Sequence, residues 1–161
     1  MTKNQNVLKW VEEMKALTQP DKVVWIDGSE EQLKALRDEA IATGEMIELN
    51  QEKLPGCLYH RTAENDVARV EDRTFICSRE KENAGPTNNW MDPKEMYAKL
   101  TKLYDGVMKG RTMYVIPYSM GPIGSPIAKV GVELTDSIYV VLNMSLESLS
   151  RFNDILSTNT E

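Results

Sequence analysis

The chain has 161 residues, of which 41% are hydrophobic and 27% charged, and its formal net charge is −6. This length and composition fit one globular domain, and the acidic balance argues against nucleic acid as a partner, because duplex binding depends on clustered Lys and Arg. Neither a run of about 18 apolar residues nor a signal-peptide pattern is present, which predicts no membrane partner and a cytoplasmic location.

The first fifty residues carry the signals of alternating helices and strands. Ser29 and Gln32 form a capping box that opens a helix, and Gly44 stands where a C-terminal glycine ends one. Apolar residues at helical spacing occur before Ser29, and a short apolar run lies on each side of the segment from Ser29 to Gly44. The predicted elements are a helix at 7–17, a strand at 22–26, a helix between Ser29 and Gly44 and a strand at 46–49.

The rest of the chain predicts one well-marked helix and a group of strands. Asp92 and Glu95 form a second capping box, and Gly110 is the predicted stop. The apolar stripe of this helix is expected to be buried and comprises Met96, Leu100, Leu103, Tyr104 and Val107 or Met108. Strands are predicted at 73–77, 112–120, 128–134 and 138–142, with a terminal helix from Ser145. The Gly/Pro loop 121–126 is expected to be a turn between strands, with anion binding by its backbone N–H groups as the alternative. The chain therefore predicts an α/β fold, a single domain with a mixed β-sheet flanked by helices.

Motifs of the common catalytic centres are absent from the sequence. It contains no Gly-x-Ser-x-Gly elbow, no Gly-x-x-x-x-Gly-Lys phosphate loop and no dinucleotide-binding glycine pattern. His60 is the only histidine and is expected to be a structural hydrogen-bonding group, with a catalytic role as the alternative. Cys57 and Cys77 lack metal-ligand spacing, so no metal site is predicted. They are expected to be free thiols, with a disulfide between them as the alternative.

The segment 60–74 is the one candidate for contact with a ligand. It carries Arg61, Arg69 and Arg73 among acidic side chains. A guanidinium group is a planar fork that can grip a carboxylate or a phosphate with two parallel hydrogen bonds. From residue types alone, each arginine is expected to be an ion-pair partner within the chain, and a ligand role is the alternative.

Four stretches, in the same order, resemble the GTP-dependent phosphoenolpyruvate carboxykinases. They are VVWIDGSEEQ, HRTAENDVARVEDRTFICS, NNWMDP and MYVIPYSMGPIGSPIAKVGVELTDSIYVV, and together they cover most of residues 20–141. In that family the second stretch carries a substrate-binding arginine, which corresponds to Arg69 through the match in DVARVE. The resemblance gives no ligand role to Arg61 or Arg73.

The resemblance implies an enzyme of gluconeogenesis, a carboxy-lyase that converts oxaloacetate and GTP to phosphoenolpyruvate, GDP and carbon dioxide with manganese or magnesium. Oxaloacetate or phosphoenolpyruvate is then the partner of Arg69. The family's metal ligands, nucleotide loop and guanine pocket have no counterpart here, so GTP and the metal are expected to bind only through a missing region. We expect the chain alone to be an inactive, truncated fragment. The alternative is a non-catalytic remnant that binds a dicarboxylate weakly or acts as a protein-interaction module.

The resemblance also predicts where the chain divides. Residues 1–144 are expected to form the carboxykinase N-terminal-like domain, and residues 145–161 a divergent C-terminal tail that is helical. Beyond Val141 the resemblance fades, and the tail is expected to be an unrelated ending, with a divergent local helix as the alternative.

Overall fold

The main sheet has three strands, β1 (Lys22–Trp25), β6 (Thr112–Met120) and β7 (Lys129–Thr135), in the order β1-β6-β7. The computed structural model describes residues 2–66 and 70–148. β1 pairs in parallel with β6, and β6 pairs antiparallel with β7. The three strands predicted for these parts of the chain therefore form one mixed sheet.

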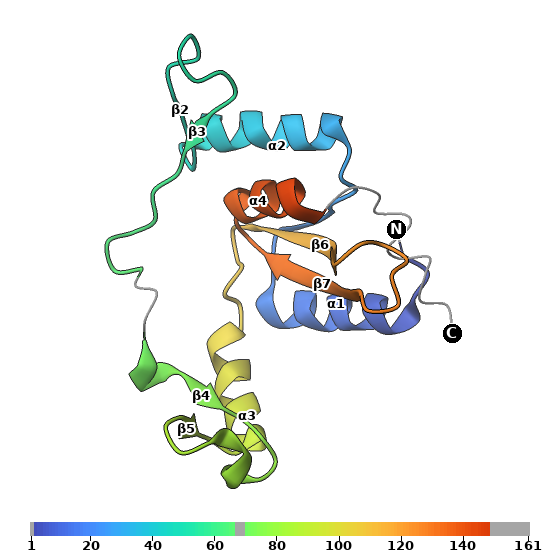
Figure 1. Ribbon diagram of the computed structural model, residues 1–161, viewed down its shortest axis with the longest axis vertical. Helices are drawn as coiled ribbons and strands as arrows, with labels where there is room; N and C mark the ends of the chain where they lie inside the picture. The colour runs from blue at the N-terminus through green and yellow to red at the C-terminus, as the bar shows by residue number, and fades with distance from the viewer. Residues whose placement is uncertain (1, 67–69, 149–161) are drawn as a thin grey trace.

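Helices cover both faces of this sheet. α2 (Glu30–Thr43) and α4 (Ile138–Ser148) lie on one side, and α1 (Gln5–Thr18) lies on the other (Figure 1). The α/β class with a mixed sheet flanked by helices is thus confirmed.

The central strand β6 supplies core side chains to both layers. Successive side chains of a strand point to opposite faces, so Tyr114 and Ile116 face α2 and α4 whereas Met113 and Val115 face α1. All four are at most 3% exposed. Burial on both faces explains why this strand is a continuous apolar run instead of an alternating one. Burial also raises the pKa of the Tyr114 phenol to about 12.

Helix α2 begins at its predicted cap, whereas the cap of α1 was not predicted. Asn4 caps α1, and the Ser29 hydroxyl accepts the N–H of Gln32 at 3.2 Å to cap α2. The Gln32 side chain does not close the predicted box, because its amide oxygen accepts the N–H of Asp27 instead, at 2.8 Å. The Asp27 carboxylate accepts the Ser29 N–H at 2.8 Å, and this hydrogen bond lowers the pKa of Asp27. Gly44 ends α2 with φ +79°, as predicted.

The strand predicted at 138–142 is wrong, since these residues open helix α4. A carboxylate oxygen of Glu45, far away in the sequence, accepts the Ser137 hydroxyl at 2.8 Å and the Tyr139 N–H at 2.9 Å. A negative group at this position satisfies free N–H groups of the first turn and favours the helix dipole. Val141 of α4 is fully buried against the sheet. The apolar run is therefore a buried helix. Of the terminal helix predicted from Ser145, residues 145–148 belong to α4, and residues 149–161 lie outside the described residues.

Two small sheets lie outside the main sheet. β2 (Ile47–Glu48) pairs antiparallel with β3 (Leu58–Tyr59), and β4 (Phe75–Ile76) pairs in parallel with β5 (Asn89–Trp90). The strands predicted at 46–49 and 73–77 are therefore present but short, because neither joins the main sheet. The 3-10 helices of this region are η1 (Glu71–Arg73) and η2 (Lys81–Ala84).

Helix α3 (Pro93–Tyr104) begins as predicted and ends early. The Asp92 carboxylate accepts the N–H of Lys94 at 2.8 Å, which caps the first turn. Gly110, the predicted stop, lies beyond the helix in a turn, with φ +77°. Its N–H donates to the carboxylate of Asp21 at 3.0 Å, so it links this turn to the entry of β1.

The predicted burial of the α3 stripe is wrong. None of the α3 residues is buried, and Leu103 and Tyr104 are 64% and 51% exposed. The physical reason is position, because α3 lies with β4 and β5, away from the main sheet (Figure 1). Only Met108, past the end of the helix, packs against the apolar cluster between α1 and the sheet.

Candidate functional site

The arginine-bearing segment connects the two small sheets. Arg69, the predicted substrate-binding residue, lies outside the described residues. Arg61 lies 3.9 Å from a carboxylate oxygen of Glu64, and Arg73 lies 4.0 Å from one of Asp72. The ion-pair role expected for Arg61 and Arg73 is therefore confirmed. Both pairs are exposed and long, and such pairs contribute little to stability.

A polar hollow of about 480 Å³ borders the same segment. Residues 70–72 and Thr74 form one wall, and residues 87–89 form the other. The side-chain amide of Asn89 donates to the carbonyls of Glu71 at 2.8 Å and of Thr74 at 3.3 Å. One side chain of the NNWMDP stretch thus holds the turn that follows the arginine position.

This function of Asn89 was not foreseen from the sequence. The bonds join residues 18 and 15 positions apart, so no local spacing indicates them. The partners are backbone carbonyls, which every residue has, so the residue types at these positions do not indicate the bonds. The parallel pairing of β4 with β5 brings the two stretches together.

The Gly/Pro loop is a turn between β6 and β7, as predicted. The Ser125 N–H donates to the Pro122 carbonyl at 3.0 Å, and the Ala128 N–H donates to the Ser125 carbonyl at 3.1 Å. Gly121 and Gly124 have φ +101° and +84°, a backbone region that glycine adopts without strain. These internal bonds and glycines account for the loop as a connection within the fold.

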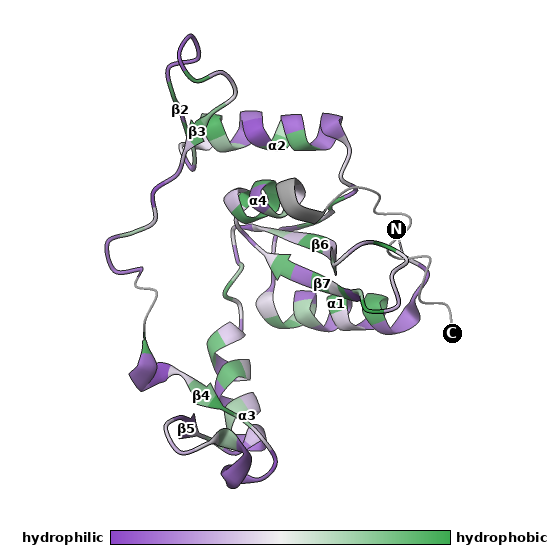
Figure 2. Cartoon of the chain, in the orientation of Figure 1, coloured by the Kyte–Doolittle hydropathy of each residue, from purple (hydrophilic) through white to green (hydrophobic). Residues whose placement is uncertain are grey.

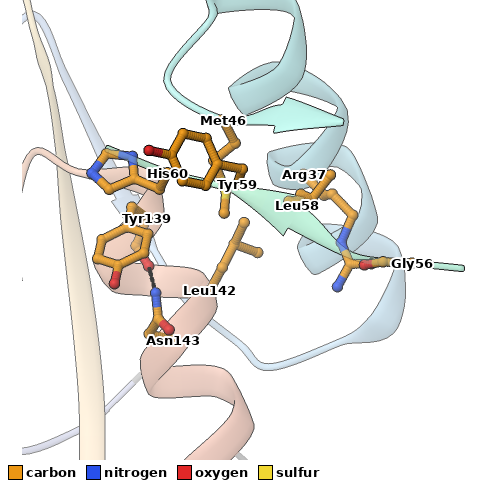
Figure 3. Close-up of a pocket in the computed structure, with 9 residues that line it drawn as sticks. All are labelled: Arg37, Met46, Gly56, Leu58, Tyr59, His60, Tyr139, Leu142 and Asn143. Carbon is orange, nitrogen blue, oxygen red and sulfur yellow. Dashed lines mark hydrogen bonds between the residues drawn. The ribbon is translucent and has the colours of Figure 1, made fainter. Parts of the chain in front are cut away.

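A second hollow, of about 380 Å³, lies between the β2–β3 hairpin and α4 (Figure 3). Its apolar side chains are Met46, Leu58 and Leu142, with His60 and Tyr139 at one side and Arg37 at the other. The Arg37 guanidinium donates to the Gly56 carbonyl at 3.5 Å. This hollow is therefore lined by apolar and polar side chains in similar measure.

His60 is a structural residue of that hollow. Its ring stacks on Tyr139 with centroids 4.1 Å apart and planes 16° apart. Nδ1 lies 2.7 Å from the carbonyl oxygen of Glu45, which can only accept, so Nδ1 carries the proton. The expected hydrogen-bonding role is therefore confirmed. Glu45 makes two links, because its carbonyl holds His60 and its carboxylate holds the start of α4.

The remaining predicted sites concern metals and thiols. Within residues 2–66 and 70–148, no three His, Cys, Asp or Glu side chains are grouped so that they could hold a metal ion. Cys57 and Cys77 are free and exposed, which confirms the predicted thiols. Among the same residues, no helix has the length and apolar character needed to cross a bilayer.

Fold and site together define an α/β domain whose arginine-bearing segment and asparagine-held turn border a polar hollow. The family described as the phosphoenolpyruvate carboxykinase N-terminal domain matches residues 9–155. The chain belongs to this family, as the four stretches indicated. The match extends past residue 144, and the division of the chain at that position stays a prediction.

Individual bacterial proteins show the same similarity. The chain is 59% identical over 145 residues to the phosphoenolpyruvate carboxykinase [GTP] of Anaeromyxobacter sp. (strain K), which covers 90% of this chain and 24% of that protein. It is 50% identical over 145 residues to the protein of that name from Corynebacterium jeikeium, with the same coverage. For Corynebacterium kroppenstedtii the identity is 49% over 159 residues, covering 95% of this chain and 26% of the relative. The chain thus spans about a quarter of the length of the relatives it matches.

Proposed function

We propose that the chain is the substrate-contributing N-terminal portion of a GTP-dependent phosphoenolpyruvate carboxykinase. The observation that carries this proposal is the continuous family match over residues 9–155. The complete enzyme is a carboxy-lyase of gluconeogenesis that acts in the cytoplasm on oxaloacetate and GTP. Its products are phosphoenolpyruvate, GDP and carbon dioxide.

Arg69 is the residue that we assign to substrate binding. Loss of carbon dioxide from oxaloacetate leaves the bonding electrons in an enolate, whose oxygen then attacks the γ-phosphorus of GTP. A fixed guanidinium near the substrate carboxylate holds the anion and stabilises charge that develops in these steps. The assignment is supported by the hollow beside Val70 and by the Asn89 bonds that hold the following turn.

Manganese or magnesium and GTP belong to other parts of the complete enzyme in this proposal. The described residues group no set of carboxylates, thiols or imidazoles suited to a metal ion. The sequence also lacks a phosphate-binding loop. Neither the metal nor the nucleotide is therefore assigned to side chains of this chain.

The 161-residue chain alone is expected to form no phosphoenolpyruvate from oxaloacetate and GTP. Phosphoryl transfer depends on positioned metal ions and cations, and Arg69 is the only such group assigned here. The measurement is a coupled assay for phosphoenolpyruvate with added manganese, with the complete Anaeromyxobacter enzyme as the positive control. Turnover by the purified chain above the rate without protein would contradict the proposal.

A weak dicarboxylate-binding module is the second candidate, favoured by the Arg69 segment and its adjoining hollow. Titration of oxaloacetate or phosphoenolpyruvate, followed by NMR, is expected to give a Kd of about 1 mM or weaker, because one cation barely offsets the cost of association. Arg69→Ala should abolish the binding. Arg61→Ala is the matched control and should leave it unchanged, since Arg61 faces Glu64. Equal binding by Arg69→Ala would remove the assignment of this residue.

A further inference from the structure

Helix α3 has an apolar face that the described residues leave open. The face comprises Met96, Tyr97, Leu100, Leu103 and Tyr104, whose spacing of three and four places them on one side of the helix. Tyr97 is 75% exposed, Leu103 64%, Tyr104 51% and Leu100 38%. Figure 2 shows green, hydrophobic positions along α3. We call these five residues the α3 face.

Two contacts of α3 and its C-terminal end involve side chains outside this face. The Lys99 ammonium lies over the Phe75 ring, 5.7 Å from its centroid. Just after the helix, the Asp105 carboxylate accepts the side-chain amide of Gln19 at 3.0 Å. The first contact lies beside β4 and the second ties the end of α3 to the end of α1, and neither covers the four exposed side chains of the α3 face.

An open face of this kind is unusual for a helix of this length. A helix of 12 residues is marginal in water without packing, even with the Asp92 cap and the proline of its first turn. Contiguous exposed apolar side chains mark interaction surfaces, whereas scattered ones need no explanation. Two tyrosines and two leucines on one side form such a contiguous set.

We propose that the α3 face docks against the portion of a carboxykinase chain that lies beyond the matched quarter. The inference rests on the proposed function. The relatives contain a segment equivalent to this chain and roughly three times as much additional sequence, since the match covers 24% of their length. That additional sequence is the occupant to which we commit, because it is present in each relative and the described residues supply no cover for the face.

The test compares the isolated chain with a chimera in which residues 9–155 replace the matched quarter of the Anaeromyxobacter enzyme. Hydroxyl-radical footprinting, normalised to an added reference peptide, reads the solvent access of Tyr97 and Tyr104. Both are expected to react at least about fivefold more slowly in the chimera, because a side chain in an interface core loses most of its exposed area. Unchanged reactivity in the chimera overturns the docking.

Paired variants give a second measurement. Leu103→Lys is expected to leave the melting temperature of the isolated chain unchanged and to lower that of the chimera. Ala98→Lys adds the same charge on the opposite side of α3 and should lower neither. Equal effects of the two variants in the chimera would overturn the proposal.

Other occupants give different results. Protection of both tyrosines in the isolated chain that increases with protein concentration indicates a second copy, and protection independent of concentration indicates the chain itself. Either result overturns the proposal. A chimera that forms phosphoenolpyruvate while Tyr97 stays reactive refutes the docking alone. An inactive chimera with both tyrosines protected refutes the proposed function alone.

Discussion

Ile116→Ala is expected to lower the free energy of unfolding by about 3 to 4 kcal/mol. Ile116 is fully buried at the centre of β6, where it packs among residues of α2 and α4. Removal of its outer carbons forfeits the burial of apolar surface and leaves a cavity that a packed core closes only partly. Urea unfolding followed by circular dichroism measures the change as a lower midpoint at an unchanged slope.

Ile127→Ala is the matched control for this prediction. Ile127 is 82% exposed in the loop between β6 and β7, so the same deletion should change the stability by no more than about 0.5 kcal/mol. Similar losses for the two variants would mean that β6 is not the centre of the core.

Glu45→Ala is expected to cost about 2 kcal/mol, because it removes one carboxylate that accepts two hydrogen bonds. These bonds come from the Ser137 hydroxyl and the Tyr139 N–H, at 2.8 and 2.9 Å. Without them, the first turn of α4 keeps free N–H groups and loses a favourable charge at its positive end. Thermal unfolding should show a decrease in Tm of about 5 °C for a chain of this size.

Glu48→Ala provides the comparison at an exposed glutamate three residues away, in β2. It removes the same charge from the same region and should leave Tm nearly unchanged. A decrease in Tm as large as that of Glu45→Ala would indicate that net charge, and not the cap of α4, accounts for the effect.

The elements that the sequence predicts well are those whose signals are local. Ser29 and Asp92 cap their helices within three residues, and Gly44 adopts the backbone conformation that ends a helix. The long apolar run of β6 and the alternation in β7 are equally local patterns. Each can be recognised without knowledge of the rest of the fold.

The failures involve contacts between distant residues. The run at 138–142 has β-branched and apolar residues typical of a strand, yet Glu45, more than ninety positions earlier, caps it as a helix. The apolar stripe of α3 indicates that this side of the helix packs against something. The periodicity does not specify the partner, and within the described residues the stripe is not buried. In both cases the local pattern is compatible with two structures, and contacts outside the segment decide between them.

The candidate site shows the same limit. The sequence singled out the segment 60–74 and, through resemblance, Arg69 within it. It did not indicate that Asn89 would hold the turn after that arginine, since an asparagine bonded to backbone carbonyls has no characteristic spacing. The types of residue that could grip an anion were visible, whereas the side chain that supports them was not.

The strand order β1-β6-β7 has a consequence for folding during synthesis. Lys22 of β1 pairs with Thr112 of β6, so the two strands of the parallel pair are separated by ninety positions in the sequence. A nascent chain emerges from the ribosome at about 5 to 20 residues per second, so β1 waits for several seconds before its partner exists. During that interval α1 and β1 expose the apolar side chains that β6 later covers. Chaperones that bind exposed apolar segments are therefore expected to engage the N-terminal residues before the β6–β7 hairpin leaves the ribosome.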